Sequence, residues 1–396
     1  MAAPLLHVIG AGPWQLATIR RARALGYRVL VTDGTAHRPG YAEADLHAIA
    51  DITDAEATLA AARHHAVDGV LCDTTDNGVV AAAYTAQQLG LPGIGLEVAR
   101  NCTDKARMTA CAQSAGLRVP GSERVRCLDQ ALAAARRLPA PWVVKPVDNQ
   151  SGRGVSIVQG ELDLAAAIEL AFRCSRSQQI LVQEWVPGLE VIVDTIVNAG
   201  EVHCLGIATK VPYADNATVA QRITYGPVGL AVPQAVIAET NARLVRALGI
   251  RQGLVHAEYK LHDGAAVPID VAARGGGVHI YPVVLPHVSG VDAMRMAIDL
   301  ALGRPCRIEP HDVPRGANIE FLRAAPGRIV AIEGLDAARA EPGVALLHIN
   351  HSVGDRIGAL QDKEQRLGHL VVLADTAAGA LAASARAVQA IDVRVQ

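Results

Sequence analysis

HAEYKLHDGAAVPIDVAARGGG, residues 256–277, contains two short runs of extended-type residues joined by an Asp-Gly turn signal. This pattern predicts a β-hairpin. In such a hairpin Glu258 and Asp270 lie on neighbouring strands with their side chains on one face, because successive residues of a strand alternate between faces. Two carboxylates so placed repel each other unless a cation lies between them. Hard oxygen ligands of this kind suit Mg²⁺ bound to nucleotide phosphates.

The residues after the second run carry a cation and three glycines. Arg274 adds a planar fork for an anion, and Gly275, Gly276 and Gly277 allow backbone to approach a ligand closely. An acidic pair on a hairpin is also typical of a solvated sheet face, and three glycines are also typical of a flexible turn. The segment by itself is therefore compatible with two interpretations, a metal–phosphate site and a solvent-exposed sheet surface.

Length and composition limit the class of protein. A chain of 396 residues is long enough for two or three domains. Its 37 Lys plus Arg and 39 Asp plus Glu give a net charge of −2, so we expect no nucleic-acid partner. The seven cysteines are scattered and form no CxxC pair, which favours reduced thiols in a cytoplasmic protein. We expect no membrane partner, since no apolar run reaches the roughly 18 to 20 residues of a membrane helix.

The first hundred residues alternate strand and helix, with strands at 5–10, 28–33 and 69–74 and helices at 14–27 and 55–64. This order predicts a doubly wound α/β domain with a parallel sheet.

A glycine turn in this first domain raises a second interpretation. Gly10 and Gly12 form a tight strand-to-helix turn, and Asp33 ends the next strand. A dinucleotide fold places its glycines and its ribose carboxylate in this way. Because of this match, an NAD-dependent dehydrogenase stays an alternative, although the last glycine of the motif is missing.

From residue 103 onward the pattern is α+β. We expect strands at 142–147, 155–159 and 179–185, a strand pair at 191–198 and 201–208, and helices at 162–175, 233–249 and 292–302. A Gly/Pro-marked break then introduces a last domain, where residues 319–334 suggest a second hairpin.

Three further segments favour a nucleotide. Lys145 ends an apolar strand and is followed by the glycine-bearing loop DNQSGRG at 148–154, which can offer backbone N–H groups to phosphates. Lys105, at the start of a helix, can supply a second cation. The stretch QEWVPGLE at 183–190 can hold a purine by backbone and a ribose by Glu190. Each lysine alone would be typical of a solvated surface.

In this order and spacing the segments resemble the ATP-grasp superfamily, particularly carboxylate-amine ligases such as the L-amino acid (dipeptide) ligases. The resemblance covers essentially the whole chain. It implies an α/β pre-ATP-grasp domain at 1–102 and an ATP-grasp domain at 103–302 with a mobile lid at about 107–182. A small C-terminal α+β subdomain follows at 303–396.

The resemblance also implies roles for individual residues. Arg274 and Lys145 are the expected catalytic residues, and Glu258 and Asp270 the metal ligands. Asp270 is shorter than the family's usual Glu, and Ala272 replaces the family's asparagine ligand. The number of metal ions that the site binds, one or two, therefore stays open. A substrate site is expected at Arg274, Gly275, Gly276 and His279. The expected nucleotide-binding residues are Lys105, Lys145, Ser151, Gly152, Gly154, Gln183, Glu184, Trp185, Val186, Glu190 and Lys210.

The activity implied by the resemblance has two steps. ATP phosphorylates a small-molecule carboxylate to an acyl phosphate, and an amine then displaces phosphate, with His256 and His279 as candidate proton acceptors. The cofactors are ATP and Mg²⁺, with Mn²⁺ as a substitute, and a homodimer is left open. Besides the dehydrogenase, a carboxylase that activates bicarbonate and a catalytically silent nucleotide-binding module remain alternatives. The substrates stay open, with residues 73–77, 213–225 and 279–287 as candidate specificity segments.

Overall fold

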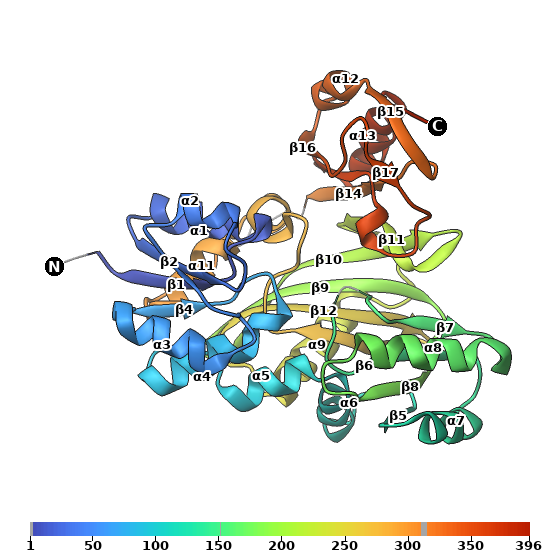
Figure 1. Ribbon diagram of the computed structural model, residues 1–396, viewed down its shortest axis with the longest axis horizontal. Coiled ribbons are helices and arrows are strands. Elements are labelled where there is room, and N and C mark those ends of the chain that lie inside the picture. Colours follow the sequence, from blue (N-terminus) through green and yellow to red (C-terminus); the bar gives the residue numbers. More distant parts are fainter. Residues whose placement is uncertain (1–2, 151, 310–314) are drawn as a thin grey trace.

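The computed structural model describes residues 3–150, 152–309 and 315–396. An eight-stranded sheet forms the centre of the molecule. An N-terminal sheet lies at one end of it, a small lid sheet near the other end, and the C-terminal part stands above it (Figure 1). This arrangement confirms the α/β and α+β fold class expected from the sequence.

The N-terminal domain is built on four parallel strands in the order β3-β2-β1-β4. All five residues of β1 are buried, as expected for a parallel strand covered on both faces. Helix α11 (Ala293–Ala301), from much later in the chain, packs against α1 and β4 and closes this domain. Its strands are β1 (Leu5–Ile9), β2 (Arg28–Asp33), β3 (Leu46–Ile49) and β4 (Gly69–Leu71). Its helical segments are η1 (Pro13–Gln15), α1 (Leu16–Ala24), α2 (Pro39–Glu43), α3 (Ala55–His65), η2 (Asp76–Gly78), α4 (Val79–Leu89) and α5 (Leu96–Thr103).

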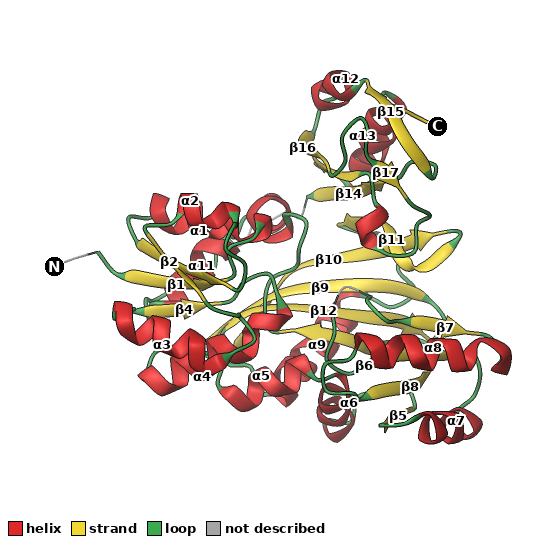
Figure 2. Cartoon of the chain, viewed as in Figure 1, coloured by secondary structure: helices red, strands yellow, loops and turns green. Residues whose placement is uncertain are grey.

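The central sheet has the order β13-β12-β9-β10-β11-β14-β18-β16, and its pairings are antiparallel. Figure 2 shows its long strands β9, β10 and β12 side by side. The last three strands come from beyond residue 302, so the sheet continues across the expected boundary with the C-terminal part. The strands and helices from 189 to 302 are β9 (Leu189–Asn198), β10 (Glu201–Tyr213), β11 (Asn216–Tyr225), α9 (Gln234–Leu248), β12 (Gly253–His262), β13 (Ala265–Ala272), η3 (Ile280–Val284) and α10 (Leu285–Ser289).

The hairpin predicted from the Asp-Gly signal is confirmed as β12 and β13. The two residues between its strands, Asp263 and Gly264, have φ angles of 46° and 72°, the left-handed pair that a two-residue hairpin turn requires. On β12 the residues at odd positions from Val255 to Leu261 are buried, while those at even positions are partly exposed. This alternation turns the even-numbered side chains, Glu258 among them, toward the cavity described below.

The lid is a four-stranded antiparallel sheet of order β5-β8-β6-β7, covered by two helices. Its elements are β5 (Ser122–Val125), α7 (Leu128–Arg137), β6 (Trp142–Pro146), β7 (Ser156–Val158), α8 (Glu161–Cys174) and β8 (Ile180–Glu184). Helix α6 (Lys105–Ser114) falls largely within the expected lid range, but it packs against α9 and β13 of the central part.

The C-terminal part contains a correction. Residues 319–334 do not form a hairpin, because both edges of β14 (Gly316–Leu322) are already paired, one with β11 and the other with β18. The next strand, β15 (Gly327–Glu333), pairs instead in a separate three-stranded sheet of order β17-β15-β19. The other elements are α12 (Leu335–Ala340), β16 (Val344–Ile349), β17 (Arg356–Ile357), η4 (Lys363–Gln365), β18 (Gly368–Ala374), α13 (Ala377–Gln389) and β19 (Asp392–Val395).

Among the described residues, no helix combines the length and the apolarity that a membrane-spanning helix needs.

Candidate functional site

A cavity of about 360 Å³ lies between the hairpin, the lid and the C-terminal part. The seventeen residues predicted for the site fall into three groups relative to this cavity. Twelve of them line it: Lys105, Lys145, Gly152, Gln183, Glu184, Trp185, Val186, Glu190, Lys210, Glu258, Asp270 and Arg274. Gly154, Gly275, Gly276 and His279 are not among its lining residues. Ser151 lies outside the described residues.

The acidic pair of the hairpin faces this cavity. Glu258 and Asp270 are direct cross-strand partners, with a β-bulge just after Glu258, so the predicted juxtaposition is confirmed. Each carboxylate is neutralised by a lysine: Lys210 Nζ lies 3.0 Å from Glu258 Oε1, and Lys105 Nζ lies 3.1 Å from Asp270 Oδ1. Burial raises the pKa of Asp270, but Lys105 and Lys145 outweigh burial and hold that pKa below its ordinary value. Asp270 is therefore an anionic oxygen ligand in this cavity, and Glu258 lies directly across from it on the neighbouring strand.

The two predicted phosphate lysines reach the same place from different elements. Lys145, on β6, donates to the Ile269 carbonyl at 3.2 Å. Burial, and then the charge of Lys105, lowers the pKa of Lys145 to about 8. Lys105 begins α6 and donates to the Asn149 carbonyl at 3.0 Å. Burial lowers the pKa of Lys105, but Asp270 and the other nearby acids outweigh burial and raise it.

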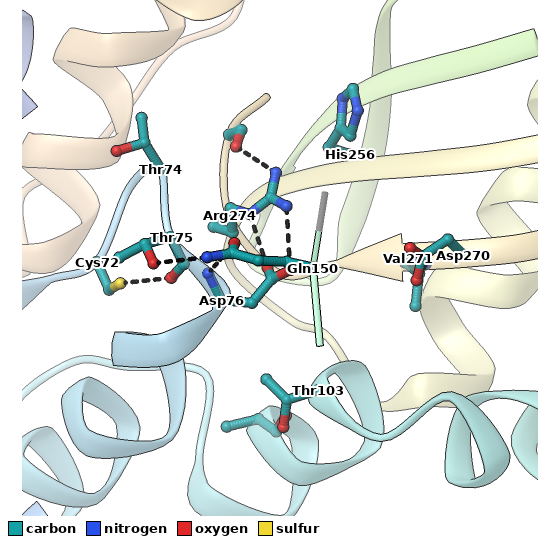
Figure 3. A network of polar contacts seen from close by, with 12 residues as sticks. Cys72, Thr74, Thr75, Asp76, Thr103, Gln150, His256, Asp270, Val271 and Arg274 are labelled. Atoms are coloured by element: carbon teal, nitrogen blue, oxygen red, sulfur yellow. Dashed lines mark hydrogen bonds and ion pairs between the residues drawn. The ribbon is translucent and has the colours of Figure 1, made fainter. Parts of the chain in front are cut away.

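The glycine loop at 148–154 is attached to two other parts of the molecule. The Gln150 side chain accepts a hydrogen bond from the Asp76 N–H at 3.0 Å, which ties the loop to the N-terminal domain (Figure 3). Arg153 pairs with Glu364 of the C-terminal part at 2.8 Å. Gly152 has a φ of 74° and lines the cavity. The loop thus lies over the cavity, as expected for a segment that contacts phosphates.

The strand end at 183–190 forms the other end of the cavity. The Glu184 N–H donates to the Gly121 carbonyl, and the Trp185 N–H donates to the Pro141 carbonyl. These two groups are therefore not available to a purine. Glu190 is held by Lys210 at 2.6 Å and by Lys260 at 3.1 Å. Burial raises the pKa of Glu190, but these two lysines outweigh burial and lower it.

Lys210 lies between two acids. Its Nζ contacts Glu190 and Glu258 at 2.6 and 3.0 Å. Burial lowers the pKa of Lys210, and the two carboxylates outweigh burial and raise it far above its ordinary value. Lys210 thus links Glu190, the predicted ribose ligand, to Glu258, a predicted metal ligand. To contact a phosphate, as predicted, Lys210 would have to leave these two carboxylates.

Arg274 is held by the N-terminal domain. Its guanidinium contacts both oxygens of Asp76, with Nε at 2.7 Å and a terminal nitrogen at 3.1 Å (Figure 3). Asp76 lies in η2, shortly after the carboxyl end of β4, where parallel α/β sheets commonly bind ligands. The fork of Arg274 is therefore already oriented at the edge of the cavity.

The structure gives the first two glycines of the GGG run a packing role. A Cβ on Gly275 would lie 2.9 Å from the Tyr281 ring, and a Cβ on Gly276 would lie 2.9 Å from His256 Nδ1. Gly277 lines the cavity and has open space where its Cβ would be. Gly275 and Gly276 therefore pack against other protein residues, which conflicts with the expectation that they contact substrate.

His279 does not line the cavity and lies in a cluster of rings. Its ring centroid is 5.7 Å from Trp14 and 5.8 Å from His369. Burial, and then His348, lowers the pKa of His279. The expected role of His279 as a substrate contact is thus not supported by its surroundings.

Sequence reasoning missed two cations from the C-terminal part. Lys363, in η4, and Arg366 line the cavity. Burial, and then Arg153, lowers the pKa of Lys363 to about 8, and burial lowers that of Arg366 to about 10. The Arg366 guanidinium lies 3.5 Å from the centroid of the Phe321 ring. No local pattern marks these residues, because a lysine and an arginine in a polar turn are common at any surface.

The glycine turn of the N-terminal domain argues against the dinucleotide alternative. The Gln15 side chain accepts a hydrogen bond from the Gly12 N–H at 3.0 Å and also lies against Gly10. It therefore occupies a backbone donor that a pyrophosphate would need. Asp33 is likewise engaged, by Arg38 at 3.0 Å.

Comparisons with known proteins agree with this geometry. Residues 138–281 match the family model of the ATP-grasp domain, and residues 320–396 match that of the L-amino acid ligase C-terminal domain 2. The chain is 26% identical over 311 residues to the uncharacterized protein y4rH of Sinorhizobium fredii, an alignment that covers 77% of this chain but only 64% of that protein.

Two further matches cover more of the related protein. A formate-dependent phosphoribosylglycinamide formyltransferase of Chlorobaculum tepidum is 23% identical over 345 residues, covering 85% of this chain and 86% of that protein. The crystal structure of an L-amino acid ligase from Bacillus licheniformis has the same fold, with a TM-score of 0.85, 22% identity and full coverage of both chains. The chain therefore contains an ATP-grasp domain and a C-terminal region that matches the L-amino acid ligase C-terminal domain 2.

Proposed function

We propose that this protein is an ATP-dependent ligase that activates a small-molecule carboxylate as an acyl phosphate and joins it to an amine. The products are an amide or peptide bond, ADP and phosphate. The observation that carries the proposal is the convergence of two lysines, two carboxylates and an oriented arginine on one cavity. Phosphoryl transfer requires this combination of positioning and charge neutralisation, and it requires no protein nucleophile.

The cations of the cavity are suited to hold a triphosphate and an acyl phosphate. Lys145 contacts a carbonyl rather than an acid, so its charge is available to a phosphate. Lys105 and the glycine loop meet at the Asn149 carbonyl, so the loop and the lysine would contact a bound nucleotide together. One edge of the Arg274 guanidinium is held by Asp76, and its remaining N–H groups suit a carboxylate or a phosphate.

A divalent cation is part of the proposal. Within residues 3–150, 152–309 and 315–396, no group of three or more His, Cys, Asp or Glu side chains is arranged as a ready-made metal site. Glu258 and Asp270 nevertheless fit Mg²⁺, which is commonly held by one or two carboxylates together with nucleotide phosphates. Bound there, the ion would neutralise charge on the phosphates. Lys105 and Lys210 now contact these carboxylates and would turn to the incoming phosphates.

Amino acids are the substrate class that we propose. The match of residues 320–396 to an L-amino acid ligase domain supports this choice. An amino acid offers both the carboxylate that is activated and the amine that attacks. Lys363 and Arg366 would assist Arg274 in holding the acid, because all three line the cavity.

The proposal is tested with the full chain, ATP and Mg²⁺ against a panel of amino acids, other carboxylates and amines. We expect ADP and phosphate to form only when both a carboxylate and an amine are present, and mass spectrometry to detect the amide. Glu258→Ala should abolish ADP formation. Turnover with bicarbonate alone would favour the carboxylase instead, and NAD binding without ATP binding would refute the ligase.

A cytoplasmic location is also part of the proposal, supported by the seven free cysteines. Cell fractionation tests it. Analytical ultracentrifugation of the purified chain decides between a monomer and a homodimer.

A further inference from the structure

His256 presents a ring nitrogen beside the proposed metal ligands. It lies two residues before Glu258 on β12, and both side chains line the cavity. His256 Nε2 is 3.9 Å from Glu258 Oε1. Its cross-strand partner on β13 is Ala272, which has no donor atom. At this end of the acidic pair, the side chain that is placed to coordinate an ion is therefore the imidazole of His256.

A buried carboxylate fixes the orientation of this ring. Asp194 is fully buried in β9, and its Oδ1 lies 2.7 Å from His256 Nδ1. The other oxygen of Asp194 accepts a hydrogen bond from the Tyr225 hydroxyl. A buried carboxylate needs hydrogen-bond donors, so we assign the hydrogen to Nδ1. Nε2 then keeps its lone pair for the cavity.

Proteins orient metal-binding histidines in this way, with one ring nitrogen on a carboxylate and the other on the ion. Two ligands that are each about 2.1 Å from an ion lie about 3 Å apart at a right angle and about 4.2 Å apart when opposite. The separation of 3.9 Å between Nε2 and Glu258 Oε1 falls within this span.

We propose that His256 is a third protein ligand of the ion held by Glu258 and Asp270, and that the site consequently prefers Mn²⁺ to Mg²⁺. Imidazole nitrogen suits first-row transition ions, whereas Mg²⁺ takes oxygen ligands. The inference rests on the proposed nucleotide and metal site. The ion enters with the nucleotide, whose phosphates draw Lys105 and Lys210 away from the carboxylates.

Electron spin-echo envelope modulation of the Mn²⁺–ADP complex tests the inference directly. The full chain is labelled with ¹⁵N-histidine, so that nitrogen of the adenine is distinguished from nitrogen of the protein. We expect a ¹⁵N coupling typical of directly bound imidazole, lost in His256→Ala and His256→Gln. The control His262→Ala keeps it, because His262 lies at the far end of the same strand beside Asp263.

Affinity gives a second readout. Asp194→Asn should weaken Mn²⁺ binding to the ADP complex by about 10- to 100-fold, and His256→Gln should reduce the preference for Mn²⁺ over Mg²⁺. If the ¹⁵N coupling is missing while ADP binds, or if Mn²⁺ affinity is unchanged in both His256 variants, the inference is overturned and the nucleotide site stands. If calorimetry detects no ADP binding, both the inference about His256 and the proposed nucleotide site are overturned.

Discussion

Gly154 of the glycine loop should be far less tolerant of a side chain than Gly152. Both residues have left-handed backbone, with φ angles of 73° and 74°. They differ in surroundings: a Cβ on Gly154 would lie 2.6 Å from the Cys174 Cβ and 3.0 Å from the Pro146 ring, whereas a Cβ on Gly152 would meet only the Thr218 carbonyl at 3.7 Å. The pair therefore separates backbone strain from steric overlap.

The magnitudes follow from these two effects. Left-handed backbone costs an alanine about 1 to 2 kcal/mol relative to glycine, and this cost applies to Gly152→Ala and Gly154→Ala alike. Overpacking adds about 1 to 3 kcal/mol in Gly154→Ala, because Pro146 belongs to β6 and Cys174 ends α8. We therefore expect Gly154→Ala to be less stable than Gly152→Ala by about 1 to 3 kcal/mol, the cost of overpacking.

Urea unfolding monitored by circular dichroism measures the difference, and the KM for ATP reports whether the loop still covers the cavity. Gly154→Ala should raise this KM more than Gly152→Ala does. Equal stability and equal KM in the two variants would refute the argument from packing. A larger defect in Gly152→Ala would mean that backbone approach to the ligand, rather than packing, decides the loop sequence.

Three other perturbations test separate features. Loss of the proton from Lys363, whose pKa is about 8, should raise the KM for the carboxylate substrate as pH rises through 8, and Lys363→Arg should flatten that pH profile. Asp76→Asn removes the anion that holds Arg274 and should lower kcat/KM by about 10-fold or more, since charged hydrogen bonds contribute about 1.5 to 3 kcal/mol; an unchanged kcat/KM would contradict this. Burial lowers the pKa of His7 to about 3, so its neutral form stabilises the fold above pH 6.5, and this contribution falls by about 1.4 kcal/mol per pH unit below 6.5. Urea unfolding at pH 7 and pH 5 should show a loss of about 2 kcal/mol that is absent in His7→Gln.

The hairpin could be predicted because its signals are local. The Asp-Gly pair alone favours the left-handed turn found at Asp263 and Gly264. Alternation along the strands then places Glu258 opposite Asp270. Each step depends on residues close in sequence, so no knowledge of the rest of the fold is needed.

The partners of Arg274 and the role of β15 could not be predicted in this way. Arg274 and Asp76 are 198 residues apart, and only the docking of two domains brings them together. The hairpin expected at 319–334 failed for a related reason, because β14 is paired on both sides by strands that come before and after it in the chain. Neighbouring residues carry no information about which edge of a strand is free.

The charges of the cavity suggest how a ligand is accepted. Asp270 is paired with Lys105, Glu258 with Lys210, and Asp76 with Arg274. No acidic partner occurs within ion-pair distance of Lys145 or Lys363 in the described part of the chain. Anionic ligands therefore meet unpaired cations before any ion pair is broken. Their phosphates can then take over Lys105 and Lys210, and each carboxylate that is released needs a new cation, which explains why a nucleotide and a divalent ion should bind together.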